Sequence, residues 1–150
     1  TLFNFAPVRP LPAEDLAKVH LLVVNEVEAA ALWGQPVVSV AQAQAAARAL
    51  RAQGPAAVVV TLGGLGAVLA DHTGEQHVPA FSVTAVDTTA AGDIFCGALA
   101  VALVEGQTLA SGVRFASAAA AIAVTRLGAQ PSAPTRAEIE GLLEPKETSL

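Results

Sequence analysis

The chain has 150 residues, of which 53% are hydrophobic and only 14% charged, and its formal net charge is −5. This length suits one compact domain that buries roughly two-thirds of its unfolded surface. The eight Lys and Arg residues are scattered through an acidic chain, which argues against a nucleic-acid partner. No apolar run approaches the ~20 residues of a membrane span, and the single cysteine, Cys96, allows no internal disulfide. We therefore expect a soluble cytoplasmic protein with neither a nucleic-acid nor a membrane partner.

The first third of the chain predicts a strand followed by two helices. Three prolines among the first twelve residues indicate an extended leading segment. Residues 20–25 (HLLVVN) form a short apolar run that ends in a polar residue, which is typical of a strand buried on both faces. Residues 26–34 predict a short helix that a glycine stops. Ser39 and Gln42 have the spacing of a capping box, so a second helix should run to about Gln53.

The middle of the chain predicts more strands. Residues 56–64 (AAVVVTLGG) are typical of a second buried strand that ends in glycines. Residues 66–86 predict a hairpin at a sheet edge, with its turn at 72–76 (HTGEQ) and an alternating second arm at 77–86 (HVPAFSVTAV).

The remainder predicts helices over about 92–104, 108–126 and 135–143. Strand, helices, strand, hairpin and helices in this order indicate an α/β fold with helices on the sheet faces. Two buried strands plus edge strands make a narrow sheet for so much apolar surface. We therefore expect another half-domain or a partner chain beside it.

Residues 90–93 (AAGD) form a turn of small residues that enters a helix. Free backbone N–H groups at a helix N-terminus, with the positive end of the helix dipole behind them, can bind a phosphate. Asp93 on the first turn is then able to accept a proton from a hydroxyl beside that phosphate. In the alternative interpretation, Asp93 is a favourable helix N-terminal acid and the turn is an ordinary one.

Two further stretches allow a functional and a structural interpretation. Residues 61–66 (TLGGLG) follow a buried strand and suit the phosphates or ribose of a nucleotide, or else form a plain hairpin turn. Asn25 and Glu28 close a strand and open a helix, either as an N-cap with its capping-box partner or as groups that order water around a phosphate-bound Mg²⁺. We expect structural or surface roles for His20, His72 and His77, which lack metal-ligand spacing.

The order of these stretches resembles a known family. NEVEAAALWG, VVVTLGGLGAVL, VPAFSVTAVDTTAAGDIFCGALAVAL and RFASAAAAIAVTRLGAQPSAPTR are together similar to the C-terminal half of the ribokinases in the PfkB carbohydrate kinase family. The DTTAAGD signature points to the family, and AVTRLGAQPSAP points to its ribokinase branch. The resemblance implies that residues 1–150 are the C-terminal ATP-binding and catalytic portion of a three-layer α/β/α fold, without the N-terminal strands and lid.

The resemblance also implies roles for single residues. Asp93 matches the catalytic base, which contacts the sugar, and Ala91, Gly92 and Asp93 line the anion hole for the γ-phosphate. Glu28 matches an acid linked to Mg²⁺ through water. The positions matching nucleotide contacts are Asn25, Thr61, Leu62, Gly63, Gly64, Leu65, Gly66 and Ser117.

Ribokinases are activated by a monovalent cation, normally K⁺, which is held mostly by backbone carbonyls. The matching positions are Asp87, Thr89, Ala123, Arg126, Gly128 and Ser132. A cation held there would stiffen the loop whose N–H groups receive the phosphate.

The implied reaction converts ATP and D-ribose into ADP and D-ribose 5-phosphate, in an enzyme that is a homodimer in the full-length family. Two alternatives remain open from the sequence. The chain could be a non-catalytic remnant or subunit that binds nucleotide, or it could belong to a PfkB kinase for another sugar or a nucleoside. The family's acceptor-selecting half has no counterpart among these residues, and acceptor orientation is a large part of kinase catalysis.

Overall fold

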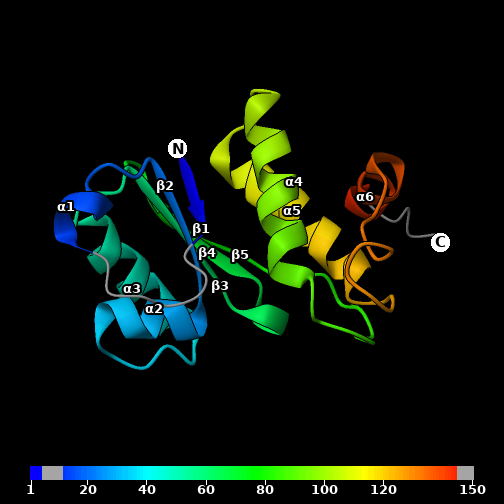
Figure 1. The fold of residues 1–150 in the computed structure, drawn as a ribbon, viewed down its shortest axis with the longest axis horizontal. Helices are drawn as coiled ribbons and strands as arrows, with labels where there is room; N and C mark the ends of the chain where they lie inside the picture. The colour runs from blue at the N-terminus through cyan, green and yellow to red at the C-terminus, as the bar shows by residue number, and fades with distance from the viewer. Residues whose placement is uncertain (5–11, 145–150) are drawn as a thin grey trace, which may run out of the picture. The chain divides into compact units, whose positions relative to one another are not determined.

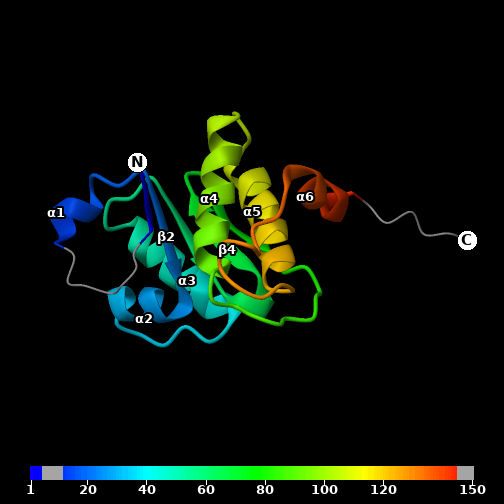
Figure 2. The same cartoon turned by 45° about the vertical axis from the view of Figure 1, so that its right-hand side comes forward.

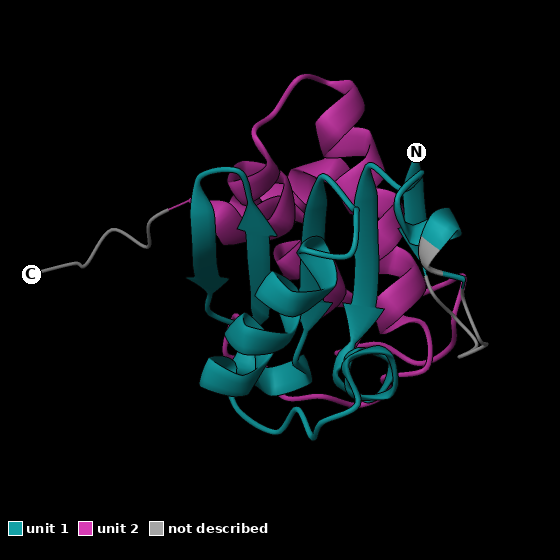
Figure 3. Cartoon of the chain, turned by 90° about the vertical axis from the view of Figure 1, so that its left-hand side faces the viewer, with its two compact units in different colours: residues 1–80 teal, residues 81–150 magenta. Residues whose placement is uncertain are grey.

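The computed structural model describes residues 1–4 and 12–144. The chain forms two compact units, Thr1–Ala80 and Phe81–Leu150 (Figure 3). The extended leading segment predicted from the prolines lies mostly outside the described residues.

Unit 1 is built on a five-stranded mixed sheet with the order β1-β2-β3-β4-β5 (Figure 1). The first three strands are parallel to one another, and β4 is antiparallel to both of its neighbours, β3 and β5. The strands are β1 Leu2–Asn4, β2 Leu21–Asn25, β3 Ala57–Thr61, β4 Ala67–Asp71 and β5 Gly74–Val78. Both predicted buried strands are confirmed, although the second ends at Thr61 rather than in the glycines at 63 and 64, which form a 3₁₀ turn. The three-residue strand β1 is too short to give a sequence signal.

The helices of unit 1 are α1 Ala13–Leu16, α2 Glu26–Trp33 and α3 Val40–Arg51. Gly34 ends α2 in the left-handed conformation, with a φ of 81°, as the sequence indicates. At the start of α3, Ser39 Oγ accepts the Gln42 N–H at 3.2 Å. The return bond differs from the predicted capping box, because Gln42 Oε1 accepts the N–H of Val38 rather than that of Ser39.

The core of unit 1 lies where α2 and α3 cover one face of the sheet (Figure 3). Alanines of α3 allow the helix to approach the sheet closely, and Leu22 and Val58 pack against them with no exposed surface. Val23 and Val59 alternate with these residues and point to the opposite face, yet they are also buried. The prediction of strands buried on both faces is therefore confirmed.

The predicted hairpin is present, but the residues predicted for its turn and its second arm are wrong. Asp71 Oδ1 accepts both the N–H and the hydroxyl of Thr73, at 2.7 and 2.6 Å. This local turn lets Asp71 pair directly with Gly74, so the loop is shorter than the predicted 72–76. The second arm ends at Val78 rather than at residue 86, because Pro79 has no N–H with which to continue the ladder.

Unit 2 contains the helices α4 Ala91–Val104, α5 Leu109–Ala123 and α6 Arg136–Leu143. Helices α4 and α5 lie side by side in both views (Figure 1 and Figure 2), and α6 packs on α5. Phe115 and Ile139 lie in the buried cluster that joins them. All three predicted helices are confirmed, although α5 ends three residues before residue 126. In the described part of the chain, no helix has the length and apolarity needed to span a membrane.

The Gly66 backbone generates a testable prediction. Gly66 has a φ of 97°, and a Cβ added there would lie 2.2 Å from the Val78 carbonyl oxygen. We expect Gly66→Ala to lower the free energy of unfolding by about 1–3 kcal/mol or more, as measured by urea unfolding. The matched control is Gly64→Ala, whose Cβ meets nothing within 4 Å. This control should change stability by less than about 0.5 kcal/mol. Equal urea midpoints for the two variants would contradict the close approach.

Candidate functional site

Two residues predicted to contact nucleotide meet at one edge of the sheet in unit 1. Asn25 ends β2 and Thr61 ends β3, and they are direct register partners in the parallel pair. Thr61 Oγ1 also donates to the Val24 carbonyl, at 3.5 Å. The carboxyl ends of parallel strands are where α/β folds bind ligands. The structure therefore brings Asn25 and the start of the 61–66 loop together.

Asn25 and Glu28 form a complete capping box at the start of α2. Asn25 Oδ1 accepts the N–H of Glu28, and Glu28 Oε2 accepts the N–H of Asn25, both at 2.8 Å. Glu28 is buried, with 7% of its surface exposed. The structural interpretation that the sequence left open is thus confirmed. The box uses neither the side-chain nitrogen of Asn25 nor Oε1 of Glu28, so the ligand roles of these two atoms stay predictions.

Residues 62–66 form the connection between β3 and β4, which contains a single 3₁₀ turn at Gly63–Leu65. Three backbone bonds hold it: Leu62 N–H to Gly66 O, Leu65 N–H to Leu62 O, and Gly66 N–H to Gly63 O, at 2.8 to 3.0 Å. Within the described residues, the N–H groups of Gly63 and Gly64 have no hydrogen-bond acceptor. The loop is a hairpin connection that leaves two adjacent amides open to a ligand.

The N-terminus of α4 differs from those of the other long helices. Helices α2, α3, α5 and α6 each begin with an Asn, Ser or Thr side chain that accepts a backbone N–H of the first turn. Helix α4 follows Ala90 and has no side-chain cap. Ala91 N–H donates to Thr88 O, but Gly92 N–H and Asp93 N–H have no acceptor among the described residues. These two amides, at the positive end of the helix dipole, are available to an anion.

Asp93 lies exposed on the first turn of α4. In the described part of the chain its carboxylate forms no hydrogen bond or ion pair, so it does not cap the helix through a bond. A Cβ built on the neighbouring Gly92 would meet nothing within 4 Å. The turn therefore presents open amides and an unpaired carboxylate on one short stretch.

Asp87 organises the loop that leads into α4. Its Oδ1 accepts the N–H and the hydroxyl of Thr89, at 2.9 and 2.5 Å, and its Oδ2 accepts the Gly128 N–H at 3.1 Å. Val124 O accepts the N–H groups of Val86 and Asp87. The hydrogen bonds from Thr89, and then that from Gly128, hold the pKa of Asp87 below its usual value. Three residues of the predicted cation set thus lie together.

The other predicted residues of unit 2 lie on α5 and the segment after it. Ala123 O accepts the N–H of Arg126 at 3.0 Å. Ser132 is almost fully buried, with its hydroxyl donating to Ala129 O at 2.7 Å. Ser117 is half-buried in the middle of α5. Asn25, Glu28 and the 61–66 loop belong to unit 1, whereas Asp87, Asp93 and the residues named here belong to unit 2.

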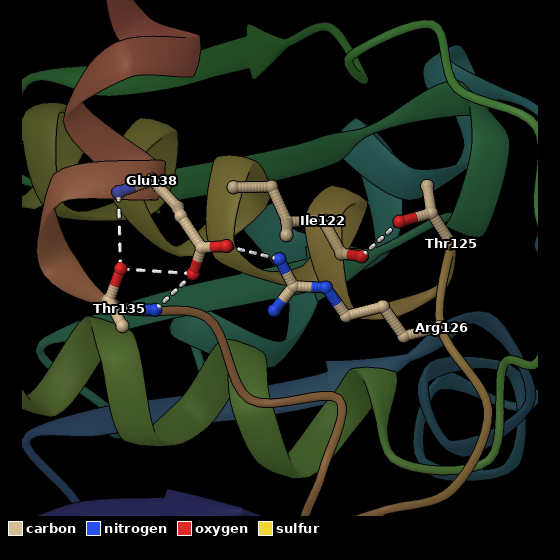
Figure 4. A network of polar contacts seen from close by, with 5 residues as sticks. All are labelled: Ile122, Thr125, Arg126, Thr135 and Glu138. Carbon is tan, nitrogen blue, oxygen red and sulfur yellow. Dashed lines mark hydrogen bonds and ion pairs between the residues drawn. The ribbon is translucent and has the colours of Figure 1, made fainter.

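A polar network joins Arg126, in the segment after α5, to α6 (Figure 4). The Arg126 guanidinium pairs with Glu138 Oε1, while Glu138 Oε2 accepts the N–H and the hydroxyl of Thr135, at 2.7 and 2.9 Å. These bonds, first that from the Thr135 N–H and then that from Arg126, lower the pKa of Glu138 to about 2. Sequence reasoning missed Glu138, although Thr135 and Glu138 have the spacing of a capping box.

Comparison with known proteins shows the family. Residues 5–136 match the pfkB family of carbohydrate kinases. The chain belongs to this family.

Its named relatives include the ribokinase of Haemophilus influenzae, which is 39% identical over 143 residues, covering 95% of this chain and 47% of that protein. The deoxyribokinase of Salmonella typhi is 39% identical over 135 residues, which cover 89% of this chain and 44% of that protein. The structure of Arabidopsis thaliana ribokinase, complexed with ribose and ATP, superposes with a TM-score of 0.88 at 34% identity, covering 95% of this chain and 47% of that one. The predicted ribokinase-like α/β fold is confirmed, and the chain spans about half the length of these relatives.

The Glu138 network predicts a specific loss of stability in acid. The pKa of Glu138 is lowered from 4.5 to about 2 on folding. The stabilisation is therefore complete above pH 4.5 and is lost as the pH falls from 4.5 through about 2. We expect Glu138→Gln to unfold at lower urea concentration at pH 7 and to show a flatter dependence on pH across this window.

The matched control is Glu140→Gln, on the same helix but outside the Thr135–Arg126 network. This variant should keep the slope of the unmodified chain between pH 4.5 and 2. Parallel curves for Glu138→Gln and the unmodified chain would contradict the lowered pKa.

Proposed function

We propose that the protein containing this chain transfers the γ-phosphoryl group of ATP to D-ribose, giving ADP and D-ribose 5-phosphate. The observation that carries the proposal is the uncapped N-terminus of α4, where two open amides lie beside the unpaired carboxylate of Asp93. Membership of the carbohydrate kinase family and the likeness to a ribokinase that was crystallised with ribose and ATP support it.

Asp93 acts as the general base in this proposal. Its carboxylate accepts the proton of the sugar hydroxyl as the hydroxyl oxygen bonds to the γ-phosphorus and the bond to the β-phosphate oxygen breaks. Negative charge then develops on the transferred group. Ala91, Gly92 and Asp93 line the anion hole that stabilises this charge, with the N–H groups of Gly92 and Asp93 as its donors, and the absence of a side chain at Gly92 lets the phosphate approach.

The nucleotide is bound, in the same proposal, by the sheet-edge residues of unit 1 and by Ser117 of α5. Asn25 keeps its side-chain nitrogen outside the capping box, and Gly63 and Gly64 offer unpaired amides to the phosphates. The remaining contacts come from the loop formed by Thr61, Leu62, Leu65 and Gly66.

Two cations belong to the proposal, and the residues fit both. K⁺ would be held by Asp87 and Thr89 together with the backbone of Ala123, Arg126, Gly128 and Ser132. Among the described residues, no cluster of three or more His, Cys, Asp or Glu side chains is present. One carboxylate with carbonyl and hydroxyl oxygens is the donor set of a hard cation rather than of zinc. Mg²⁺ keeps most of its water, and Glu28 Oε1, outside the capping box, would bond to that water.

A second acceptor is a genuine alternative, because a relative of equal identity is named deoxyribokinase. The proposed chemistry at Asp93 is the same for either sugar, so the two alternatives differ only in the acceptor. A cytoplasmic location, expected from the single cysteine and the lack of a long apolar run, also forms part of the proposal, as does a homodimeric assembly, which the family resemblance implies.

The test is a coupled ADP-release assay with ATP, Mg²⁺, K⁺ and ribose. We expect Asp93→Asn to lower kcat by roughly 10²–10⁴-fold, because the base is lost, while thermal unfolding changes little. Asp15→Asn is the matched control, since it makes the same change in the first turn of α1, and its turnover should be unaltered.

Full turnover in Asp93→Asn would remove the assigned base. Faster turnover with deoxyribose than with ribose would favour the alternative acceptor. ATP binding without sugar-dependent ADP release in the unmodified protein that contains this chain would favour a nucleotide-binding role without catalysis.

A further inference from the structure

His77, for which the sequence predicts only a structural or surface role, contacts the 61–66 loop. The ring nitrogen Nε2 lies 2.7 Å from the Leu65 carbonyl oxygen, across twelve residues of sequence. A carbonyl can only accept, so Nε2 must carry the hydrogen and donate it. Because His77 pairs with Val68 in the ladder between β4 and β5, its backbone is fixed by the sheet. The ring therefore anchors the loop to a rigid element.

The loop needs such an anchor because it is rich in glycine. Three of the five residues between β3 and β4 are glycines, and glycine loses more conformational freedom on folding than any other residue. Gly66 has a φ of 97° and a ψ of −137°, so the peptide between Leu65 and Gly66 can take orientations that are closed to other residues. Within the described residues, the bond from His77 is the one side-chain hydrogen bond to positions 62–66.

Fixing the Leu65 carbonyl also fixes the amides that precede it. The Leu65 N–H donates to Leu62 O and the Gly66 N–H donates to Gly63 O, so the 3₁₀ turn and the Leu65–Gly66 peptide move together. The close approach of Gly66 to the Val78 carbonyl holds the far end of the loop against β5. The amides left open by this arrangement are those of Gly63 and Gly64.

We propose that His77 is a positioning residue for nucleotide binding: by donating from Nε2 to the Leu65 carbonyl, it holds the 61–66 loop with the Gly63 and Gly64 amides ready for a phosphate. The inference rests on the proposed function, because it names what prepares the nucleotide loop. A loop ordered before binding loses less conformational entropy when ATP arrives, so the effect appears in affinity.

The experiment compares His77→Leu, which removes the donor, with His77→Gln, whose side-chain nitrogen reaches a similar position to Nε2. Amide hydrogen exchange in the chain without ligand should become faster at Leu65 and Gly66 in His77→Leu and stay near that of the unmodified chain in His77→Gln. The Kd for ATP with Mg²⁺, measured by calorimetry, should rise roughly 3- to 10-fold in His77→Leu and less than about 2-fold in His77→Gln. Gln76→Leu, at the exposed neighbouring position on β5, should leave both measurements unaltered.

Three results would overturn the proposal. In the first, His77→Leu keeps the exchange rates and the ATP affinity of the unmodified chain, which would leave the proposed function intact. In the second, His77→Gln is as impaired as His77→Leu, which would show that ring packing matters rather than the N–H donor. In the third, the unmodified chain has no affinity for ATP. That result would contradict the proposed function as well as the role of His77, even if exchange at Leu65 responds to the substitutions.

Discussion

The hydrogen bonds to the Asp87 carboxylate are the constraint on which the proposed chemistry depends. One oxygen fixes the turn at Thr89, and the other receives the Gly128 N–H from the segment after α5. The residues between Asp87 and α4 are small and include no side-chain cap, so they have little packing of their own to define their path. The three hydrogen bonds to this carboxylate, with the bonds from the Val86 and Asp87 N–H groups to Val124 O, therefore hold the chain where it enters α4. The open amides of Gly92 and Asp93 are presented by that entry.

The start of α4 in unit 2 and the 62–66 connection in unit 1 share one feature, because both leave backbone N–H groups without an acceptor among the described residues. Every other long helix satisfies a first-turn amide with a side-chain oxygen, whereas α4 leaves its amides open. The 62–66 connection likewise bonds three of its amides internally and leaves those of Gly63 and Gly64 without an acceptor among the described residues. Unpaired amides cost free energy unless water or a ligand satisfies them. Both turns contain glycine and are held by a side chain, Asp87 in one unit and His77 in the other, and this supports a shared role in binding an anion.

The sequence predicts those parts of the fold that depend on neighbouring residues, such as hydrophobic patterns and helix caps. It predicts the candidate site only in part, because some of its contacts join residues that are distant in the sequence. Buried strands and helix N-caps follow from short patterns, and the structure confirms the buried strands and the caps at Asn25 and Ser39, although Gln42 Oε1 accepts the N–H of Val38 rather than that of Ser39. The second hairpin arm was wrong because Asp71 tightens the turn and Pro79 ends the strand, and both effects override the alternation in 77–86. The glycine-containing stretches 61–66 and 90–93 correctly indicated where the two candidate turns lie, and the spacing of Asn25 and Glu28 indicated the capping box. The bond between His77 and Leu65 could not be predicted, because it depends on how β5 folds back beside the loop.

The central claim is that the open amides receive phosphate, and its most direct test is an NMR titration of the ¹⁵N-labelled chain with ATP and Mg²⁺. The account predicts that the amide signals of Gly92 and Asp93 shift with ATP concentration, together with those of Gly63 and Gly64, because these N–H groups gain an anionic acceptor. The Gln42 amide of α3 and the Glu138 amide of α6, each of which already donates to a side-chain oxygen, should keep their signals in place. Unchanged signals at Gly92 and Asp93 in a chain that binds ATP would contradict the account.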